Sequence, residues 1–202
     1  MPLEVGVRVV LFSFLGFALG SLPLAVWVGK IGARADIRHH GDGNPGAANA
    51  WRAGGWPVGL AALVLDVAKG AAPVAMARAL GGLWGWVLLP VALAPLLGHA
   101  FSPWLRLRGG KAVASTFGVW SALTYWEVPT ILGLSVALIR TVQAVDAWAV
   151  VLATPIALLY LVLRDAEPWL VVVWGANVAL LVWTHRRELH SPPRWRRWRG
   201  ER

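Results

Sequence analysis

The chain has 202 residues, of which 57% are hydrophobic and 14% charged, with no cysteine and a mean hydropathy of +0.59. This composition is typical of an integral membrane protein, and zero cysteine excludes disulfides, a thiolate nucleophile and cysteine-ligated metals. The formal net charge of +9 is carried by residues that cluster between long apolar blocks. We therefore expect an all-α, polytopic membrane protein.

Seven apolar segments are candidates for membrane-spanning helices, which need about 20 residues to cross a core about 30 Å thick. The expected spans are 5–28, 56–80, 83–102, 111–126, 128–139, 147–163 and 169–184. The fourth and fifth are short, and the break at "EVP" between them fits either a loop or a kink. Counts of five or six spans therefore also fit. The first span lacks the features of a cleaved secretory signal, so we expect a mature helix.

Most of the nineteen Lys and Arg residues fall on one side of this seven-span arrangement. Because basic residues in short loops mark the cytoplasmic face, the N-terminus is expected outside and the C-terminus in the cytoplasm. We expect one transmembrane domain over 1–189 and a basic cytoplasmic tail over 190–202. Trp and Arg both favour the lipid interface, so this tail is predicted to anchor at headgroups rather than to bind nucleic acid.

A polar, glycine-rich segment, "HHGDGNPGAANAWR", connects the first two spans. Gly43 and Gly46 permit backbone conformations and close approaches that a Cβ would block. Asn44 and Asn49 add side-chain donors, and Arg52 adds a forked cation. Phosphate oxygens only accept hydrogen bonds, so this set predicts a phosphate-binding loop. An ordinary interhelical turn is the alternative, and it would account for Asn-Pro-Gly alone.

Asp66 and Lys69 lie inside the second expected span. They are three residues apart and therefore share a helix face. Ionisable residues within a span favour a functional role. A mutually neutralised structural pair is the alternative.

The segment "RGGK" precedes the fourth expected span and is a second candidate anion site. Gly109 and Gly110 leave the backbone uncrowded, and Lys111 supplies a point charge. A helix N-terminus follows, which favours anions through its free N–H groups. The spacing is not that of a P-loop, and a basic loop that only sets topology is the alternative.

Two histidines lie near helix ends on the expected cytoplasmic side, His99 near the end of the third span and His185 at the end of the seventh. Each suits either acid–base chemistry or a structural hydrogen bond. The sequence has no metal-ligand spacing and no Gly-x-Ser-x-Gly elbow. An enzyme built from these residues is therefore expected to use no metal and no other cofactor.

The ordered set of motifs resembles one family. "GSLPLAVWVGK", "DIRHHGDGNPGAANAWR", "LDVAKG", "GHAFSPWLRLRGGKAVAS" and "HRREL" are similar in order and spacing to the bacterial acyl-phosphate:glycerol-3-phosphate acyltransferases of the PlsY type. The resemblance implies a seven-helix inner-membrane enzyme with a cytoplasmic active site. It implies acyl transfer from acyl-phosphate to the first hydroxyl of glycerol-3-phosphate, giving lysophosphatidic acid and phosphate in phospholipid synthesis. The partners are these substrates and membrane lipids, without nucleic acid.

The resemblance also implies the site residues. The expected catalytic residues are Asn44, Arg52, Lys111 and His185. The expected substrate-binding residues are Ser21, Arg38, Asp42, Gly43, Gly46, Asn49, Asp66, Lys69, His99, Gly109, Gly110, Ser115, Arg140, Arg186 and Glu188. An acyl-phosphate is already activated, so catalysis would rest on positioning two anions and on stabilising charge at the carbonyl oxygen. The donor phosphate is a plausible proton acceptor for the attacking hydroxyl.

Three positions depart from the family pattern. Asp42 replaces a serine, Ala112 replaces a glycine, and Glu188 replaces an asparagine. An ionised Asp42 would repel a phosphate unless it pairs with Arg38 or Arg52. These departures leave two alternatives open, a non-catalytic relative that binds lipid phosphates and an acyltransferase with a different acceptor. A small anion transporter is a third, although no internal repeat is visible.

Overall fold

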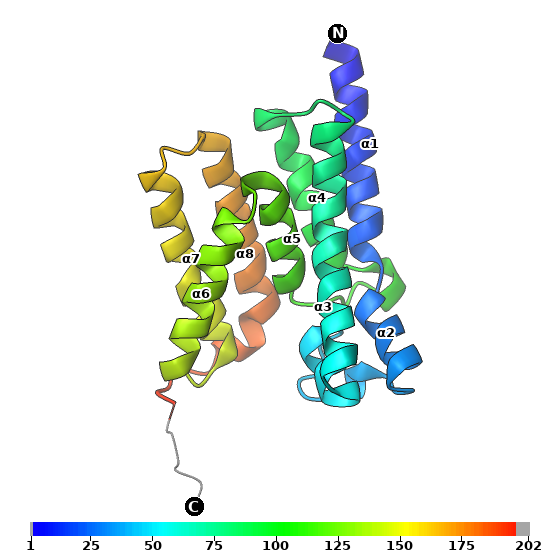
Figure 1. Cartoon of the computed structure of the whole chain (residues 1–202), viewed down its shortest axis with the longest axis vertical. Helices are drawn as coiled ribbons and strands as arrows, with labels where there is room; N and C mark the ends of the chain where they lie inside the picture. Colours follow the sequence, from blue (N-terminus) through cyan, green and yellow to red (C-terminus); the bar gives the residue numbers. More distant parts are fainter. Residues whose placement is uncertain (1, 197–202) are drawn as a thin grey trace, which may run out of the picture.

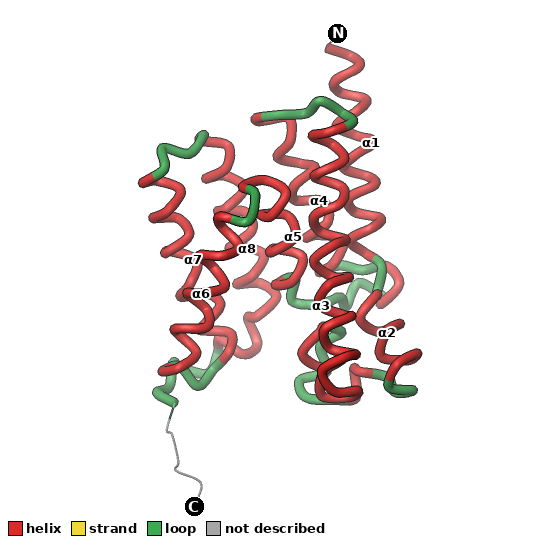
Figure 2. Tube along the Cα trace, in the orientation of Figure 1, coloured by secondary structure: helices red, strands yellow, loops and turns green. Residues whose placement is uncertain are grey.

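The computed structural model describes residues 2–196, and within them it is entirely helical, without β-strands (Figure 1, Figure 2). Long apolar runs form helices in a membrane because lipid offers no hydrogen bonds to the backbone. The α-helices are α1 (Pro2–Ser21), α2 (Leu24–Gly32), α3 (Ala47–Ala79), α4 (Leu89–Ala100), α5 (Val113–Thr124), α6 (Glu127–Val142), α7 (Asp146–Leu163) and α8 (Pro168–Leu189). Short 3-10 helices are η1 (Ile37–His39), η2 (Gly85–Leu88) and η3 (Pro103–Leu105).

The expected all-α membrane architecture is confirmed. Five helical stretches are long and apolar enough to span a membrane, namely Leu3–Gly32, Ala47–Ala79, Gly85–Leu105, Asp146–Leu163 and Pro168–Leu189. The other two, α5 and α6, have 12 and 16 residues. At 1.5 Å per residue they reach only about 18 and 24 Å.

The connection between α5 and α6 is a turn and not a kink. Tyr125 and Trp126 both have positive φ angles, 49° and 73°, which reverse the chain direction. Figure 1 shows α5 rising from the lower end and α6 descending beside it. The open choice between a loop and a kink at "EVP" is therefore resolved in favour of a tight turn.

The first expected span, 5–28, is interrupted. α1 ends at Ser21 and α2 begins at Leu24. Pro23 lacks an N–H group and cannot continue the hydrogen-bond ladder of α1. The break frees the carbonyl oxygen of Leu22, which accepts a hydrogen bond of 2.8 Å from Lys69 Nζ.

The second expected span, 56–80, begins nine residues earlier than expected, because α3 starts at Ala47 with Gly46 as its N-cap. Gly54 and Gly55 have non-helical angles inside α3 and produce a kink. This kink separates a polar first segment of the helix from its apolar remainder, which is why the hydropathy pattern marks only the latter. Asn49 and Arg52 consequently lie on a helix rather than in a loop.

Helices α3 and α5 cross closely through glycine. A Cβ on Gly118 of α5 would collide with the Val67 carbonyl oxygen of α3 and lie 2.8 Å from the Ala71 nitrogen. Because these are backbone atoms, relief requires the helices to separate. Gly118→Ala is expected to lower the free energy of unfolding by about 1–3 kcal/mol, measured as a lower thermal midpoint in detergent.

Gly175→Ala in α8 is the matched control, since no atom lies within 4 Å of its added Cβ. Alanine favours a helix over glycine by about 1 kcal/mol, so this variant is expected to melt at or slightly above the native midpoint. Equal midpoints for the two variants would contradict a close crossing at Gly118.

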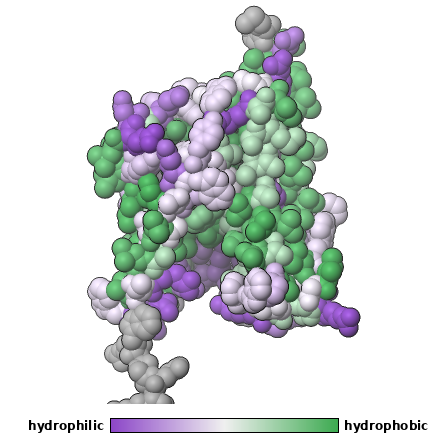
Figure 3. Space-filling model, in the orientation of Figure 1, coloured by the Kyte–Doolittle hydropathy of each residue, from purple (hydrophilic) through white to green (hydrophobic). Residues whose placement is uncertain are grey.

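The polar motifs gather at one end of the bundle, opposite the N-terminus. Figure 1 shows the connections after α2, α4 and α6 and the end of α8 in the lower half of the molecule, with the N-terminus at the top. Figure 3 shows hydrophilic residues on both sides of a hollow at the lower edge, between the α6 side and the α3 side. The basic connections that the sequence analysis assigned to one side of the membrane thus lie toward the same end of the bundle.

The expected tail, 190–202, is only partly within the described residues, since 197–202 lie outside them. Its first part folds back on the connection between α6 and α7. Gln143 and Trp195 form an isolated antiparallel bridge, and the Trp148 indole donates to the Ser191 carbonyl at 2.7 Å. Residues 190–196 thus pack against the bundle.

Candidate active site

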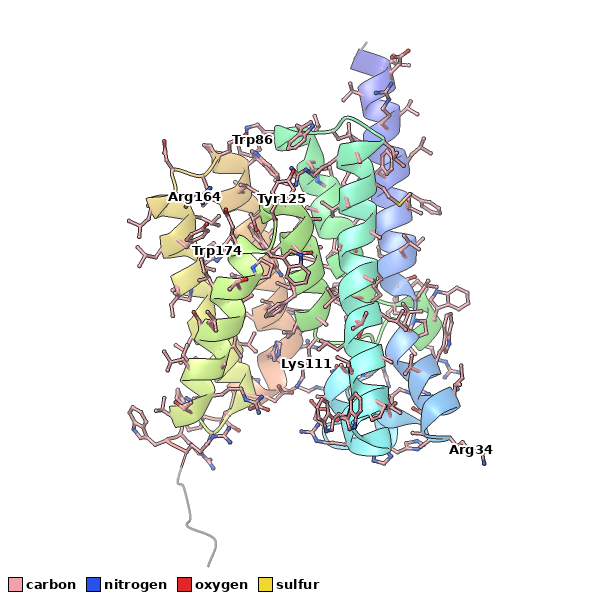
Figure 4. All side chains as sticks on the ribbon, in the orientation of Figure 1. Arg34, Trp86, Lys111, Tyr125, Arg164 and Trp174 are labelled. Atoms are coloured by element: carbon pink, nitrogen blue, oxygen red, sulfur yellow. The ribbon has the colours of Figure 1, made fainter. Side chains whose placement is uncertain are left out.

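Lys111 is the point at which three separate segments meet, and Figure 4 labels it in the lower half of the molecule. Its Nζ lies 2.6 Å from Asp42 Oδ2 in the connection before α3 and 2.7 Å from Glu188 Oε2 in the last turn of α8. The side chains are only partly exposed, 22% for Lys111, 38% for Asp42 and 34% for Glu188. Both acidic departures from the family pattern therefore contact the same cation.

Asp42 is fixed by its own loop. Its Oδ1 accepts a hydrogen bond of 3.1 Å from the Asn44 backbone N–H and one of 2.8 Å from Asn49 Nδ2. Gly43 between them has φ +75°, a conformation that glycine adopts without strain. Asp42 thus has a cationic partner, as its charge requires, but the partner is Lys111 and neither Arg38, which pairs with Asp36 at 2.6 Å, nor Arg52, which donates to Asn49.

The ion pair determines the protonation of Asp42. Partial burial raises the pKa of this carboxyl, but hydrogen bonds from Lys111, the Asn44 backbone and Asn49 outweigh burial and lower the pKa from 3.8 to about 2. Burial lowers the pKa of Lys111, and its bonds to Asp42 and Glu188 raise it overall. Asp42 and Lys111 are therefore both charged near neutral pH.

A pH dependence of stability follows from the depressed pKa of Asp42. A carboxyl whose folded pKa lies below its unfolded value contributes stability that is complete above the unfolded pKa, 3.8, and is lost as pH falls toward about 2. The difference in thermal midpoint between the native chain and Asp42→Asn is therefore expected to be constant from pH 5 to pH 8 and to change only below about pH 4. A change centred near pH 6 would contradict this.

Asn49 and Arg52 form the helical side of the site. They are three residues apart on the first turns of α3 and share a face, and Arg52 donates to Asn49 Oδ1 at 2.6 Å. Asn49 is 1% exposed and donates to the Asn44 carbonyl at 2.9 Å as well as to Asp42. Its amide therefore organises the loop, whereas the remaining guanidinium donors of Arg52 have no further partner within residues 2–196.

The "RGGK" segment packs tightly on the end of α4 instead of forming an open cradle. The N–H groups of Gly109 and Gly110 donate to the carbonyls of Ala100 and His99 at 3.1 and 3.0 Å. A Cβ on Gly109 would collide with the His99 carbonyl oxygen, and one on Gly110 with His99 Nε2. These glycines are therefore required for close approach, and their amides are already used.

A second cluster, the buried polar cluster, consists of Asp66, Lys69, His99 and Ser115. Lys69 Nζ lies 2.8 Å from Asp66 Oδ1, and both side chains are at most 6% exposed. Ser115 Oγ lies 3.1 Å from His99 Nδ1 and 3.2 Å from the Asp66 carbonyl oxygen. Ser21, whose carbonyl accepts a bond of 2.6 Å from Ser102, lies at the α1 break beside the Lys69 contact. Through His99, which packs against Gly109 and Gly110, this cluster contacts the Lys111 segment.

His185 lies in the last turns of α8, 3% exposed. Its Nδ1 is 2.8 Å from the Leu181 carbonyl oxygen. A carbonyl only accepts, so Nδ1 carries the proton of the neutral ring and Nε2 keeps a lone pair. The neighbouring Thr184 hydroxyl donates to the Lys111 carbonyl at 3.1 Å, which ties α8 to the Lys111 segment.

Three expected substrate-binding arginines make contacts away from Lys111. Arg38 pairs with Asp36, which raises the pKa of Arg38 and lowers that of Asp36. Arg140 pairs with Asp146 at 3.0 Å, at the start of α7. Arg186 stacks on Trp183 and donates to its carbonyl at 2.6 Å.

Two polar residues of α8 were not among the expected site residues. Thr184 holds the Lys111 carbonyl, as described above. Asn177 is 2% exposed and bridges Trp120 Nε1 and Thr116 Oγ1, each at 3.0 Å. An asparagine inside an apolar span is itself a signal, since a polar group in lipid needs a partner.

The arrangement as a whole offers cations, fixed amides and histidine lone pairs at one end of a helical bundle. It suits the binding of phosphate groups beside an acyl chain in the membrane. No group of three or more His, Asp and Glu residues within 2–196 could hold a metal ion.

The sequence of the chain is similar to those of several known proteins. Residues 10–191 match the family model described as glycerol-3-phosphate acyltransferase. The glycerol-3-phosphate acyltransferase of Rubrobacter xylanophilus is 39% identical, over 90% of this chain and 90% of its own. That of Synechococcus sp. is 42% identical, over 86% of each chain. Glycerol-3-phosphate acyltransferase 1 of Thermotoga maritima is 37% identical, over 76% of this chain and 83% of its own.

Two solved structures share the fold. Both are crystal structures of PlsY (YgiH), an integral membrane glycerol 3-phosphate acyltransferase, one in the glycerol 3-phosphate form and one in the lysophosphatidic acid form. The first superposes with a TM-score of 0.82 at 28% identity and the second with 0.81 at 27%. Each comparison covers 90% of both chains.

Proposed function

The chain belongs to the glycerol-3-phosphate acyltransferase family, and from this membership we propose that it transfers a fatty acyl group from acyl-phosphate to the 1-hydroxyl of glycerol-3-phosphate. The products are lysophosphatidic acid and inorganic phosphate, which places the enzyme in phospholipid synthesis. The observation that carries the proposal is the junction at Lys111, a cation that contacts two other segments at the same end of a multi-pass membrane protein.

Two phosphate-bearing substrates need two sets of cationic and amide partners. Arg52 on α3 and Lys111 before α5 supply the cations. Asn44 supplies a side-chain amide that makes no hydrogen bond within the described residues. These groups would hold the two anions against their mutual repulsion and place the acceptor hydroxyl on the acyl carbon. The binding energy is then used for positioning, which is the main requirement for an already activated mixed anhydride.

The reaction itself needs one proton to move. The acceptor hydroxyl attacks the acyl carbonyl, the bond to the phosphate oxygen breaks, and the hydroxyl proton passes to a base. The departing phosphate is such a base, and His185 Nε2, with its lone pair, is a second. Lys111 would stabilise the negative charge that develops on the carbonyl oxygen or on the leaving phosphate.

The buried polar cluster is proposed to keep the site rigid. His99 contacts Gly110, and Gly109 fits against the carbonyl of His99, so the Lys111 segment cannot shift without disturbing α4. Sites built on such packed elements hold catalytic groups in a fixed orientation.

We also propose a seven-pass topology in the bacterial inner membrane, with the lower end of Figure 1 in the cytoplasm. The antiparallel course of α5 and α6 supports seven passes although both helices are short. The absence of cysteine from the chain gives a direct test by single-cysteine labelling. His190→Cys is expected to react with a membrane-impermeant maleimide only after permeabilisation of whole cells. Glu167→Cys, at the other end, is expected to react before it.

The activity is tested with detergent-purified protein and palmitoyl-phosphate. Phosphate release is expected only when glycerol-3-phosphate is present, and palmitoyl-coenzyme A is expected to give none. Arg52→Ala is expected to reduce the acceptor-dependent release by about 10²-fold, as for loss of a charged substrate contact. A folded native protein that releases no phosphate with any acceptor would refute the proposal.

A further inference from the structure

The two carboxylates of the site cancel its two cations. The carboxylates of Asp42 and Glu188 lie within 2.7 Å of Lys111 Nζ. Arg52 is linked to them through Asn49, which accepts a hydrogen bond from Arg52 and donates one to Asp42. Two negative and two positive side chains give a local net charge of zero. A site meant to attract a phosphate dianion therefore has no excess of positive charge before the substrate arrives.

The donors of Lys111 are also occupied. An ammonium group has three N–H donors. One is directed to Asp42 and one to Glu188, which leaves a single donor for a phosphate oxygen. A phosphate that approaches Lys111 must either accept this single bond or displace a carboxylate.

The two carboxylates differ in their freedom to move. Asp42 keeps the hydrogen bonds from Asn44 and Asn49 after Lys111 leaves, so it stays in place as a fixed anion. The Glu188 carboxylate has no other hydrogen bond within residues 2–196, and it projects from the last turn of α8. Glu188 can therefore swing toward solvent at little cost, whereas Asp42 remains beside any bound phosphate.

We propose that Asp42 and Glu188 act as built-in competitors of the acceptor phosphate at Lys111, and so set a weak affinity for glycerol-3-phosphate. This inference rests on the proposed function and concerns the same site. The same competition promotes release of the product phosphate, because the carboxylates return to Lys111 as the anion leaves. Asp42, the fixed member, has the larger effect on affinity.

The test replaces each carboxylate by its amide, which keeps the size and planar shape of the group and removes its charge. Asp42→Asn is expected to lower the KM for glycerol-3-phosphate about threefold to tenfold, and Glu188→Gln by a smaller factor. Inhibition by inorganic phosphate is expected to strengthen in the same order. In the double variant the KM should rise with ionic strength, since its site has a net positive charge that salt screens, whereas the native KM should depend little on salt.

Two controls separate this inference from its alternatives. Glu127→Gln, in an ion pair with Arg164 at the opposite end, is expected to leave the KM unchanged. Calorimetric titration of each folded variant with glycerol-3-phosphate measures affinity without turnover, so the inference stays testable if the native protein gives no product. An unchanged or raised KM and Kd in both amide variants would overturn it, because the carboxylates would then only position Lys111. A larger effect at Glu188 than at Asp42 would overturn the assignment of Asp42 as the fixed anion.

Discussion

Lys111→Ala is expected to lower the rate of acyl transfer by about 10²–10³-fold, the usual loss when one preorganised charge partner of the transition state is removed. The effect has two physical sources. The cation that would face the phosphate disappears, and the carboxylates of Asp42 and Glu188 are left near each other without a counter-charge. Both changes make the site repel an anion. The measurement is kcat/KM for acceptor-dependent phosphate release, compared with the native protein.

Lys30→Ala is the matched control, because Lys30 is an exposed lysine at the same end of the bundle in α2. It removes the same charge from the same face without touching the junction, and its kcat/KM is expected to stay within about twofold of native. A triple variant, Lys111→Ala with Asp42→Asn and Glu188→Gln, is expected to recover part of the lost phosphate affinity but little of kcat. A Lys111→Ala enzyme with near-native kcat/KM would show that Lys111 serves only structure.

Much of this fold follows from the pattern of hydropathy. Long apolar blocks separated by charged connections require membrane helices, and the concentration of Lys and Arg in alternate connections places them at one end. The breaks inside helices were less predictable. Pro23 interrupts the first span within an apolar run. The first turns of α3, before the kink at Gly54 and Gly55, have a polar sequence that hydropathy does not mark as part of a span. Hydropathy averaged over a span does not register such local backbone changes.

The site was predictable in its segments but not in its pairs. Motif order placed Asp42, Lys111 and Glu188 in three connections of the same face, and the sequence showed that Asp42 needs a cationic partner. The partner is Lys111, 69 residues away in the sequence, and the pair depends on how the Asp42 loop and the Lys111 segment meet in space. Arg38 and Arg52 were nearer in sequence, yet Asp36 and Asn49 already occupy them. The spacing of residues along the sequence does not show which of several nearby acceptors an arginine will bind.

The glycines illustrate the same limit. "RGGK" resembles an open anion loop in sequence, since glycine is required wherever backbone amides approach a phosphate. In the structure Gly109 and Gly110 are required by the end of α4, and their amides bond to it. One sequence feature thus serves two different physical needs, and only the packing partner distinguishes them.

Asp66→Asn is expected to destabilise the protein by about 3–5 kcal/mol, the usual cost of leaving a buried charge without its partner. Asp66 and Lys69 are 1% and 6% exposed. In Asp66→Asn the buried Lys69 ammonium would keep its hydrogen bond to the Leu22 carbonyl but would have lost its counter-charge. The thermal midpoint in detergent, followed by tryptophan fluorescence, measures the loss.

The double variant Asp66→Asn with Lys69→Met distinguishes a charge effect from a packing effect. Removing both charges leaves no buried ion, so this variant is expected to be more stable than Asp66→Asn alone, although it also loses the bond to Leu22. Equal destabilisation of the single and double variants would mean that the shape of Asp66, rather than its charge, holds α3 against α4 and α5. Because His99 joins this cluster to the Lys111 segment, the double variant should fold yet lose activity. Such a result would show that the buried ion pair holds the Lys111 segment in place for catalysis and is not needed for the stability of the bundle.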